Sequence, residues 1–155
     1  MFGKKTLLLI GGSGELGHAI TNKFAFQRFR KWKVFNIDYT PNSNAAQNFI
    51  LDKDEPFTAP KIERLHKELK SFAEECDSII DLATAQSLVP LSDANIFEEY
   101  ERVQQAELLS SMLTVHLASH FLSPNGYVAF SGSSKHFSAE DNKHLLESVC
   151  KKTTM

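Results

Sequence analysis

The chain has little of several features that would place it in a specialised class. Its 155 residues include only two cysteines, Cys76 and Cys150, which excludes a disulfide framework and suits a reducing compartment. The formal net charge is -2 and the basic residues form no stripe, so nucleic-acid binding is not indicated. No apolar run approaches the roughly 18 residues of a membrane helix, and glycines interrupt the run where a signal peptide would need one. We therefore expect a cytoplasmic protein with no nucleic-acid or membrane partner.

Glycine is scarce as well, but four of the seven glycines fall in one short segment, Gly11-Gly12-Ser13-Gly14-Glu15-Leu16-Gly17. The segment follows an apolar run that reads as a buried strand and precedes residues that can form a helix. In that context Gly12 and Gly14 allow a tight turn and a close approach to a pyrophosphate, while Gly17 allows the helix to pack against the strand. The N-terminus of the helix favours the phosphate charge. The alternative is a glycine-rich turn that binds nothing.

An acidic residue supports the first interpretation. Asp38 closes the next apolar run, 21 residues after Gly17, where a carboxylate can accept hydrogen bonds from the adenosine ribose hydroxyls. The same carboxylate would repel a 2′-phosphate. The sequence therefore predicts an NAD(H) site, with NADP(H) as the less favoured cofactor.

Apolar runs alternate with segments of helical period along the whole chain, which predicts one α/β domain over residues 1–155. We expect an open, Rossmann-like parallel sheet of about five strands in the order 3-2-1-4-5, with helices on both faces. The expected strands are 7–10, 33–38, 47–51, 77–83 and 127–131, and the expected helices are 16–29, 61–75, 95–122 and 140–152. Gly12, Asp38, Ala83 and Ser131 then share the carboxyl edge of the sheet, where Ala83 and Thr84 would border the nicotinamide half of the cofactor.

The expected helix at 95–122 carries apolar residues on more than one face. One face can cover the sheet, and the other can pair with the same helix of a second subunit, which predicts a homodimer. His116 and His120 lie four positions apart on this helix, a spacing that can hold zinc. No glutamate in the metalloprotease pattern and no obvious third ligand accompany them, so we expect no metal and assign them to helix packing or a polar dimer seam.

These motifs together resemble the short-chain dehydrogenase/reductase superfamily and, within it, the quinonoid dihydropteridine reductases. The glycine segment is similar to the family's Gly-Gly-x-Gly-x-Leu-Gly turn, and Asn36-Ile37-Asp38 is similar to its second strand. Residues 115–122 and 125–132 resemble its long fifth helix and the following strand. The resemblance implies a homodimer that transfers hydride from NADH to a pterin-like small molecule in tetrahydrobiopterin recycling. The residues that would hold the cofactor are Gly11, Gly12, Ser13, Gly14, Glu15, Leu16, Gly17, Asp38, Ala83 and Thr84.

The chain departs from the family where catalysis would occur. Family members carry a Tyr-x-x-x-Lys pair after the fifth strand, but no tyrosine follows Ser131 here. Plain counting places those two positions near Leu146 and Cys150, neither of which can replace them. The family's sixth and seventh strands also have no counterpart before Met155. An NADH-binding or dimerising pseudoenzyme, or a truncated isoform, is therefore the alternative to an active reductase.

Two serines and three basic residues remain as candidates near the reacting end. Ser131 and Ser133 stand where the wider superfamily places a serine that steadies the substrate oxygen, or they belong to a polar turn. Lys135, His136 and His144 follow them and offer a substitute proton donor, with imidazole suited to proton transfer near neutral pH.

Overall fold

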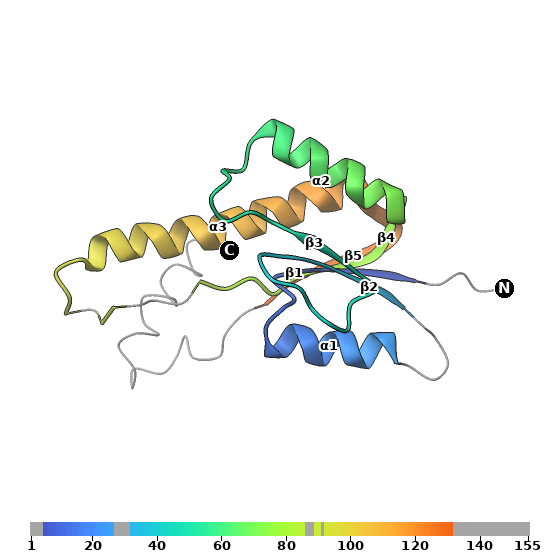
Figure 1. Cartoon of the computed structure of the whole chain (residues 1–155), viewed down its shortest axis with the longest axis horizontal. Helices are drawn as coiled ribbons and strands as arrows, with labels where there is room; N and C mark the ends of the chain where they lie inside the picture. The colour runs from blue at the N-terminus through green and yellow to red at the C-terminus, as the bar shows by residue number, and fades with distance from the viewer. Residues whose placement is uncertain (1–4, 27–31, 86–88, 91, 132–155) are drawn as a thin grey trace.

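The computed structural model describes residues 5–26, 32–85, 89–90 and 92–131. Five strands form one parallel sheet in the order β3-β2-β1-β4-β5, as predicted (Figure 1). The strands are β1 Thr6–Ile10, β2 Lys33–Asp38, β3 Gln47–Ile50, β4 Cys76–Asp81 and β5 Leu122–Phe130. The helices are α1 Glu15–Ala25, α2 Ala59–Phe72 and α3 Ile96–Phe121. The described part of the chain is therefore a Rossmann-like α/β fold.

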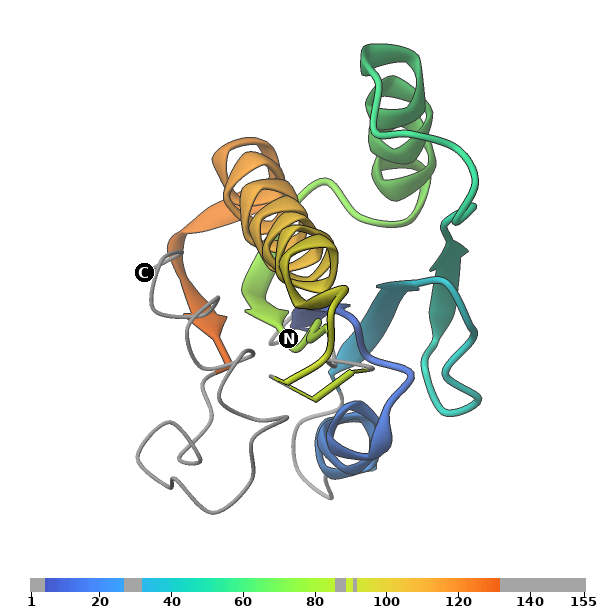
Figure 2. The ribbon, with the colours of Figure 1, turned by 90° about the vertical axis from the view of Figure 1, so that its left-hand side faces the viewer.

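Helices cover both faces of the sheet, as expected. Figure 2 shows α1 on one side of the strands and the long helix α3, with α2 beside it, on the other. A large apolar cluster joins the sheet to α2 and α3 and contains Leu8, Ile37, Leu69, Leu117 and Phe121. A smaller cluster joins Leu7, Leu9 and Val34 to α1. Residues of β1 thus alternate between the two cores, which explains why this strand is apolar throughout.

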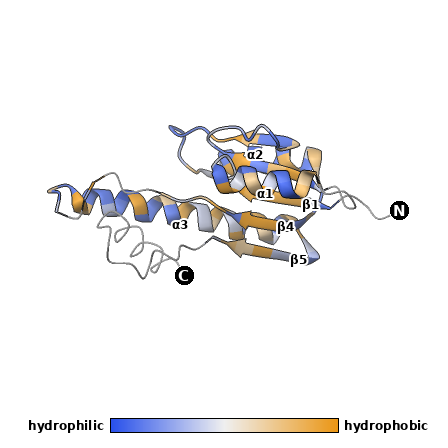
Figure 3. Ribbon diagram, turned by 90° about the horizontal axis from the view of Figure 1, so that it is seen from below, coloured by the Kyte–Doolittle hydropathy of each residue, from blue (hydrophilic) through white to orange (hydrophobic). Residues whose placement is uncertain are grey.

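The hydropathy of the elements follows their burial. The central strands are coloured as largely hydrophobic and the helices show two colours along their length (Figure 3). All five residues of β1 are buried, whereas β5, at the edge of the sheet, has no fully buried residue. Among the described residues, no helix has the length and apolar character needed to cross a membrane.

The start of β5 differs from the prediction. Pro124-Asn125-Gly126 was expected to form a turn before a strand at 127, but β5 already begins at Leu122, directly after α3. The strand tolerates Pro124 because it lies at the sheet edge, where a missing N–H leaves no neighbouring strand without a donor. The register against β4 shifts between Cys76 and Ser78, so the segment is irregular there. The helix expected at 140–152 lies outside the described residues.

Candidate functional site

The predicted cofactor residues meet at the carboxyl edge of the sheet. A cavity of about 300 Å³ opens there between the ends of β1, β2 and β4. Gly11, Asp38, Ala83 and Thr84 line it together, although they come from three separate parts of the chain. The crevice therefore lies where open parallel sheets bind ligands, beside the point at which the strand order reverses.

The glycine that makes the tight turn is not one of the two that were predicted to make it. The left-handed residue is Gly11, with φ of 73°, and not Gly12 or Gly14. A Cβ on Gly11 would lie 2.6 Å from the backbone of Ala83, and one on Gly17 would lie 2.2 Å from the carbonyl oxygen of Gly12. Gly11 therefore makes the turn, and Gly17 allows the helix to approach it as expected.

Gly14 is the exception, because a Cβ there would meet nothing within 4 Å. Gly14 is the N-cap of α1, and no side chain caps this end of the helix by a hydrogen bond. Glu15 and Leu16, which follow it, are both exposed. The first turn of α1 thus presents backbone N–H groups and open space, the features of an anion site at a helix N-terminus.

Asp38 reaches back to the glycine turn. Its Oδ2 accepts hydrogen bonds from the backbone N–H of Ser13, at 2.9 Å, and from the Ser13 hydroxyl. Its Oδ1 accepts the N–H of Tyr39 at 2.7 Å, and the Thr40 hydroxyl donates to Ser13 Oγ at 2.8 Å. The carboxylate is half-buried and ties the end of β2 to the turn after β1.

A hydrogen-bond network of three asparagines, Asn36, Asn42 and Asn48, supports the glycine turn. The sequence analysis did not identify these residues. Asn36 Oδ1 accepts the N–H of Gly12 at 3.0 Å, and its Nδ2 donates to Asn48 Oδ1 at 3.0 Å. Asn42 Nδ2 donates to the carbonyl of Gly12 at 2.7 Å and to the Thr21 hydroxyl at 2.9 Å. Both polar groups of the Gly12 backbone are satisfied in this way. The available signal was Asn36 itself, a polar residue inside an otherwise apolar strand.

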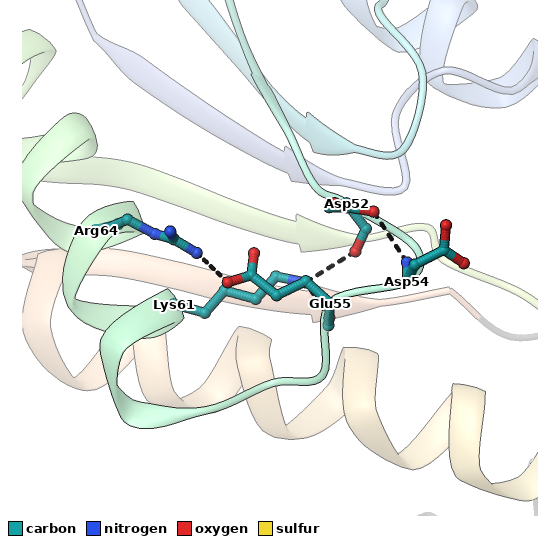
Figure 4. Close-up of polar contacts among 5 residues, drawn as sticks. All are labelled: Asp52, Asp54, Glu55, Lys61 and Arg64. Carbon is teal, nitrogen blue, oxygen red and sulfur yellow. Dashed lines mark hydrogen bonds and ion pairs between the residues drawn. The ribbon is translucent and has the colours of Figure 1, made fainter.

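The loop after β3 forms another wall of the crevice, through Leu51 and Phe57. Lys61 of α2, which is 5% exposed, donates to the backbone carbonyls of Asp52, at 2.9 Å, and Glu55, at 2.5 Å. Its ammonium also lies 4.6 Å from the centre of the Phe57 ring. Figure 4 shows Lys61 reaching the loop, with Arg64 paired to Glu55 beside it. A buried lysine of α2 therefore fixes the shape of this loop.

On the β4–β5 side a larger cavity, of about 880 Å³, is lined by Asp81, Ala83, Glu107 and Ser131 together with residues of α3. Ser131 lies at this edge as predicted, and its backbone N–H donates to the Asp81 carbonyl at 2.8 Å. Burial raises the pKa of the Asp81 carboxyl, a shift that the N–H of Ala83 opposes and the charge of Glu107 reinforces. Two buried acids therefore line the same cavity.

At the start of α3, Glu98 and Glu101 are exposed, but Glu99 is buried. Glu99 is 8% exposed and holds Arg102 by two hydrogen bonds of 2.8 Å, and Arg102 lines the smaller cavity. Glu107 is 6% exposed and accepts the N–H of Ala85 at 2.9 Å. The side chains of Glu99 and Glu107 are buried because α3 packs over the loop after β4. Helical period alone did not reveal this, since both faces of α3 carry charges.

Of the remaining candidate residues, Cys76 lies within the described part of the chain and the others lie outside it. Cys76 is a buried free thiol. Burial, together with the charge of Asp77, raises the pKa of this thiol to about 12, so Cys76 is a poor nucleophile. Ser133, Lys135, His136, His144, Leu146 and Cys150 lie outside the described residues.

Known structures of short-chain dehydrogenases share the fold of this chain. A short-chain dehydrogenase family protein from Francisella tularensis superposes with a TM-score of 0.74 at 20% identity, over 97% of this chain and 60% of that one. A short-chain dehydrogenase from Shigella flexneri gives 0.72 at 17% identity, over 97% and 63%. One from Escherichia coli, complexed with NADPH, gives 0.75 at 18% identity, over 97% and 67%. Comparisons with protein-family models and with curated protein sequences give no match.

The chain therefore has the short-chain dehydrogenase fold. It spans 60% to 63% of the length of the first two of these structures. At identities of 20% and below, the likeness concerns the fold, and the function must be argued from the residues of the site.

Proposed function

We propose that the chain binds a nicotinamide dinucleotide in the crevice at the carboxyl ends of β1 and β4. The observation that carries the proposal is the open first turn of α1, where Gly14 leaves space beside an uncapped helix N-terminus. A pyrophosphate there would accept hydrogen bonds from the N–H groups of the first turn of α1 and gain from the helix dipole. Gly11 to Gly17 would hold the pyrophosphate, and Ala83 and Thr84 would border the nicotinamide.

The preferred cofactor in this proposal is NADH. Asp38 ends β2 on the wall of the crevice, and a carboxylate in that position accepts hydrogen bonds from ribose hydroxyls but repels a 2′-phosphate. One structural neighbour binds NADPH, so the fold itself allows either cofactor. The choice rests on Asp38, which keeps lone pairs available beyond its bonds to Ser13 and Tyr39.

For the reaction we propose hydride transfer from NADH to a pterin-like acceptor, on the resemblance to dihydropteridine reductases. The acceptor would lie in the 880 Å³ cavity with Ser131 at its reacting end, and Ser133, which lies outside the described residues, is the second serine proposed for this role. Ser131 borders this cavity beside Asp81. The second candidate is a protein that binds NADH without turnover. The absence of any tyrosine after Ser131 favours it, because the family's proton donor then has no counterpart.

A homodimer through α3 belongs to the same proposal. Leu108, Leu109, Met112 and Val115 lie along α3, and each is more than 40% exposed. Leu108, Met112 and Val115 also line the 880 Å³ cavity, so a second helix would form one wall of it. Apolar side chains so arranged favour packing against a second helix. The mass of the protein in solution distinguishes a dimer from a monomer.

The test is an NADH titration followed by fluorescence, then an assay with quinonoid dihydropterin on the same sample. We expect Gly14→Val to weaken NADH binding at least tenfold while the free energy of unfolding stays unchanged, because the new side chain fills only the open space. We expect Asp38→Asn to narrow the preference for NADH over NADPH by a similar factor. Undiminished binding by Gly14→Val would overturn the site, and binding without turnover would establish the second candidate.

A further inference from the structure

Three histidines meet between α2 and α3, away from the crevice. His66 lies on α2, and His116 and His120 lie one helical turn apart on α3. The ring centres of His66 lie 5.0 Å from His116 and 4.7 Å from His120, and the last two are 4.6 Å apart. One ring nitrogen of each lies within 4.8 Å of the other two. The structure thus identifies His66 as a third candidate ligand for His116 and His120, which the sequence analysis did not find.

Hydrogen bonding prepares the His120 ring to act as a ligand. Its Nδ1 lies 2.9 Å from the carbonyl oxygen of His116 and 2.9 Å from the hydroxyl of Ser119. The carbonyl can only accept, and the Ser119 hydroxyl already donates to it, so Nδ1 carries the proton. Nε2 of a neutral His120 ring then holds a free lone pair. A histidine that donates its other N–H to a backbone carbonyl is the usual arrangement of a metal ligand.

The second observation comes from His66. Its Nε2 is buried and has no hydrogen-bond partner. A buried polar atom without a partner costs about 1–3 kcal/mol, so such atoms are uncommon unless a ligand completes them.

We propose that His66, His116 and His120 bind a divalent transition-metal ion of the zinc type. Imidazole nitrogens suit Zn²⁺, and three of them leave a fourth position for water or another ligand. Two nitrogens of a tetrahedral zinc site lie roughly 3.3 Å apart, given Zn–N bonds of about 2.0 Å. Small side-chain rotations bring the ring nitrogens from the observed separations to this distance. The exposed positions of His116 and His120 give the ion a path of entry.

The ion would join α2 to α3, and one of its ligands, His116, also borders the 880 Å³ cavity. His116 lies nine residues after Glu107, the residue that contacts the loop after β4, which corresponds to about 14 Å along the helix axis. Ring contacts among the three histidines and Phe121 lie here, beside Leu69 and Leu117 of the large apolar cluster. A metal bridge would therefore stabilise the packing of the two helices on their shared face of the sheet.

Zinc titration of the full chain, prepared without a polyhistidine tag and stripped with a chelator, tests the proposal. Calorimetry should give one ion per chain, and zinc should raise the melting temperature. We expect His66→Ala, His116→Gln and His120→Gln each to weaken zinc binding at least tenfold and to abolish that rise. Cobalt should report the same ligands through its visible absorption, which the three variants should weaken.

His18→Ala, on α1, is the matched control, and the double variant His136→Ala/His144→Ala controls for the other histidines. Both should bind zinc like the wild type. His116 and His120 are exposed, so their variants should fold normally by circular dichroism even if His66→Ala does not. Unchanged affinity in the His116 and His120 variants, an equal loss in a control, or binding only at millimolar zinc would overturn the proposal.

Discussion

The two sides of the crevice are built in different ways. On the β1–β2 side, backbone groups of the glycine turn are paired with Asn36, Asn42 and Asp38, and the glycines fit against their neighbours. On the β4–β5 side, the acids Asp81 and Glu107 are buried beside a large cavity. On the first side the backbone groups of the turn have hydrogen-bond partners, whereas the second side keeps buried acids at a cost in stability. This difference matches the sequence, which follows the short-chain dehydrogenase pattern on the first side and leaves it on the second.

The largest effect should come from filling the close contact on the β1–β2 side. Gly17→Ala places a Cβ against the carbonyl of Gly12, so we expect the free energy of unfolding to fall by about 3 kcal/mol. Gly14→Ala is the matched control and should change it by less than about 0.5 kcal/mol, since its Cβ meets nothing. Urea denaturation measures both. If both variants lose the same free energy of unfolding, Gly17 does not have the special packing role described here.

A smaller effect should follow from breaking the asparagine network. Asn36→Ala leaves the N–H of Gly12 without its partner and removes one of the two hydrogen bonds to Asn48 Oδ1, so we expect the free energy of unfolding to fall by about 2 kcal/mol. Asn44→Ala, an exposed residue of the same loop, serves as the control. If the two variants unfold at the same urea concentration, the buried network does not stabilise the turn.

The smallest effect concerns Asp81 on the other side. Burial raises its pKa, so the folded state holds this proton more tightly than the unfolded state does. The stability of the wild type should therefore fall as pH rises from the ordinary pKa of an aspartate, near about 4, to the raised value in the fold. Asp81→Asn should remove this dependence and gain about 1 kcal/mol at neutral pH.

Urea midpoints measured between pH 4 and pH 8 check the Asp81 prediction. Asp54→Asn, in an exposed loop, controls for the loss of one negative charge. A wild type and Asp81→Asn variant with parallel pH profiles would show that ionised Asp81 costs the fold nothing.

The strand order and the helices on both faces could be predicted because β1 and the glycine turn carry local signals. Apolar runs, glycine spacing and the acid at the end of β2 each depend on a few neighbouring residues. The asparagine network could not be predicted, because Asn42 reaches the turn, and Asn48 reaches Asn36, only after the strands pair. His66 was missed for the same reason, since it lies 50 positions before His116 and on another helix. The inward direction of Glu99 and Glu107 depends on how α3 packs over the loop after β4.

The buried ammonium of Lys61 has a consequence for how a cofactor would enter. By holding the carbonyls of Asp52 and Glu55, it fixes the loop that carries Phe57 before any ligand arrives. A ligand that meets a wall already in place loses little conformational entropy on binding. Association at this wall should therefore be limited by diffusion and orientation, with no slow step of loop ordering in the approach to equilibrium.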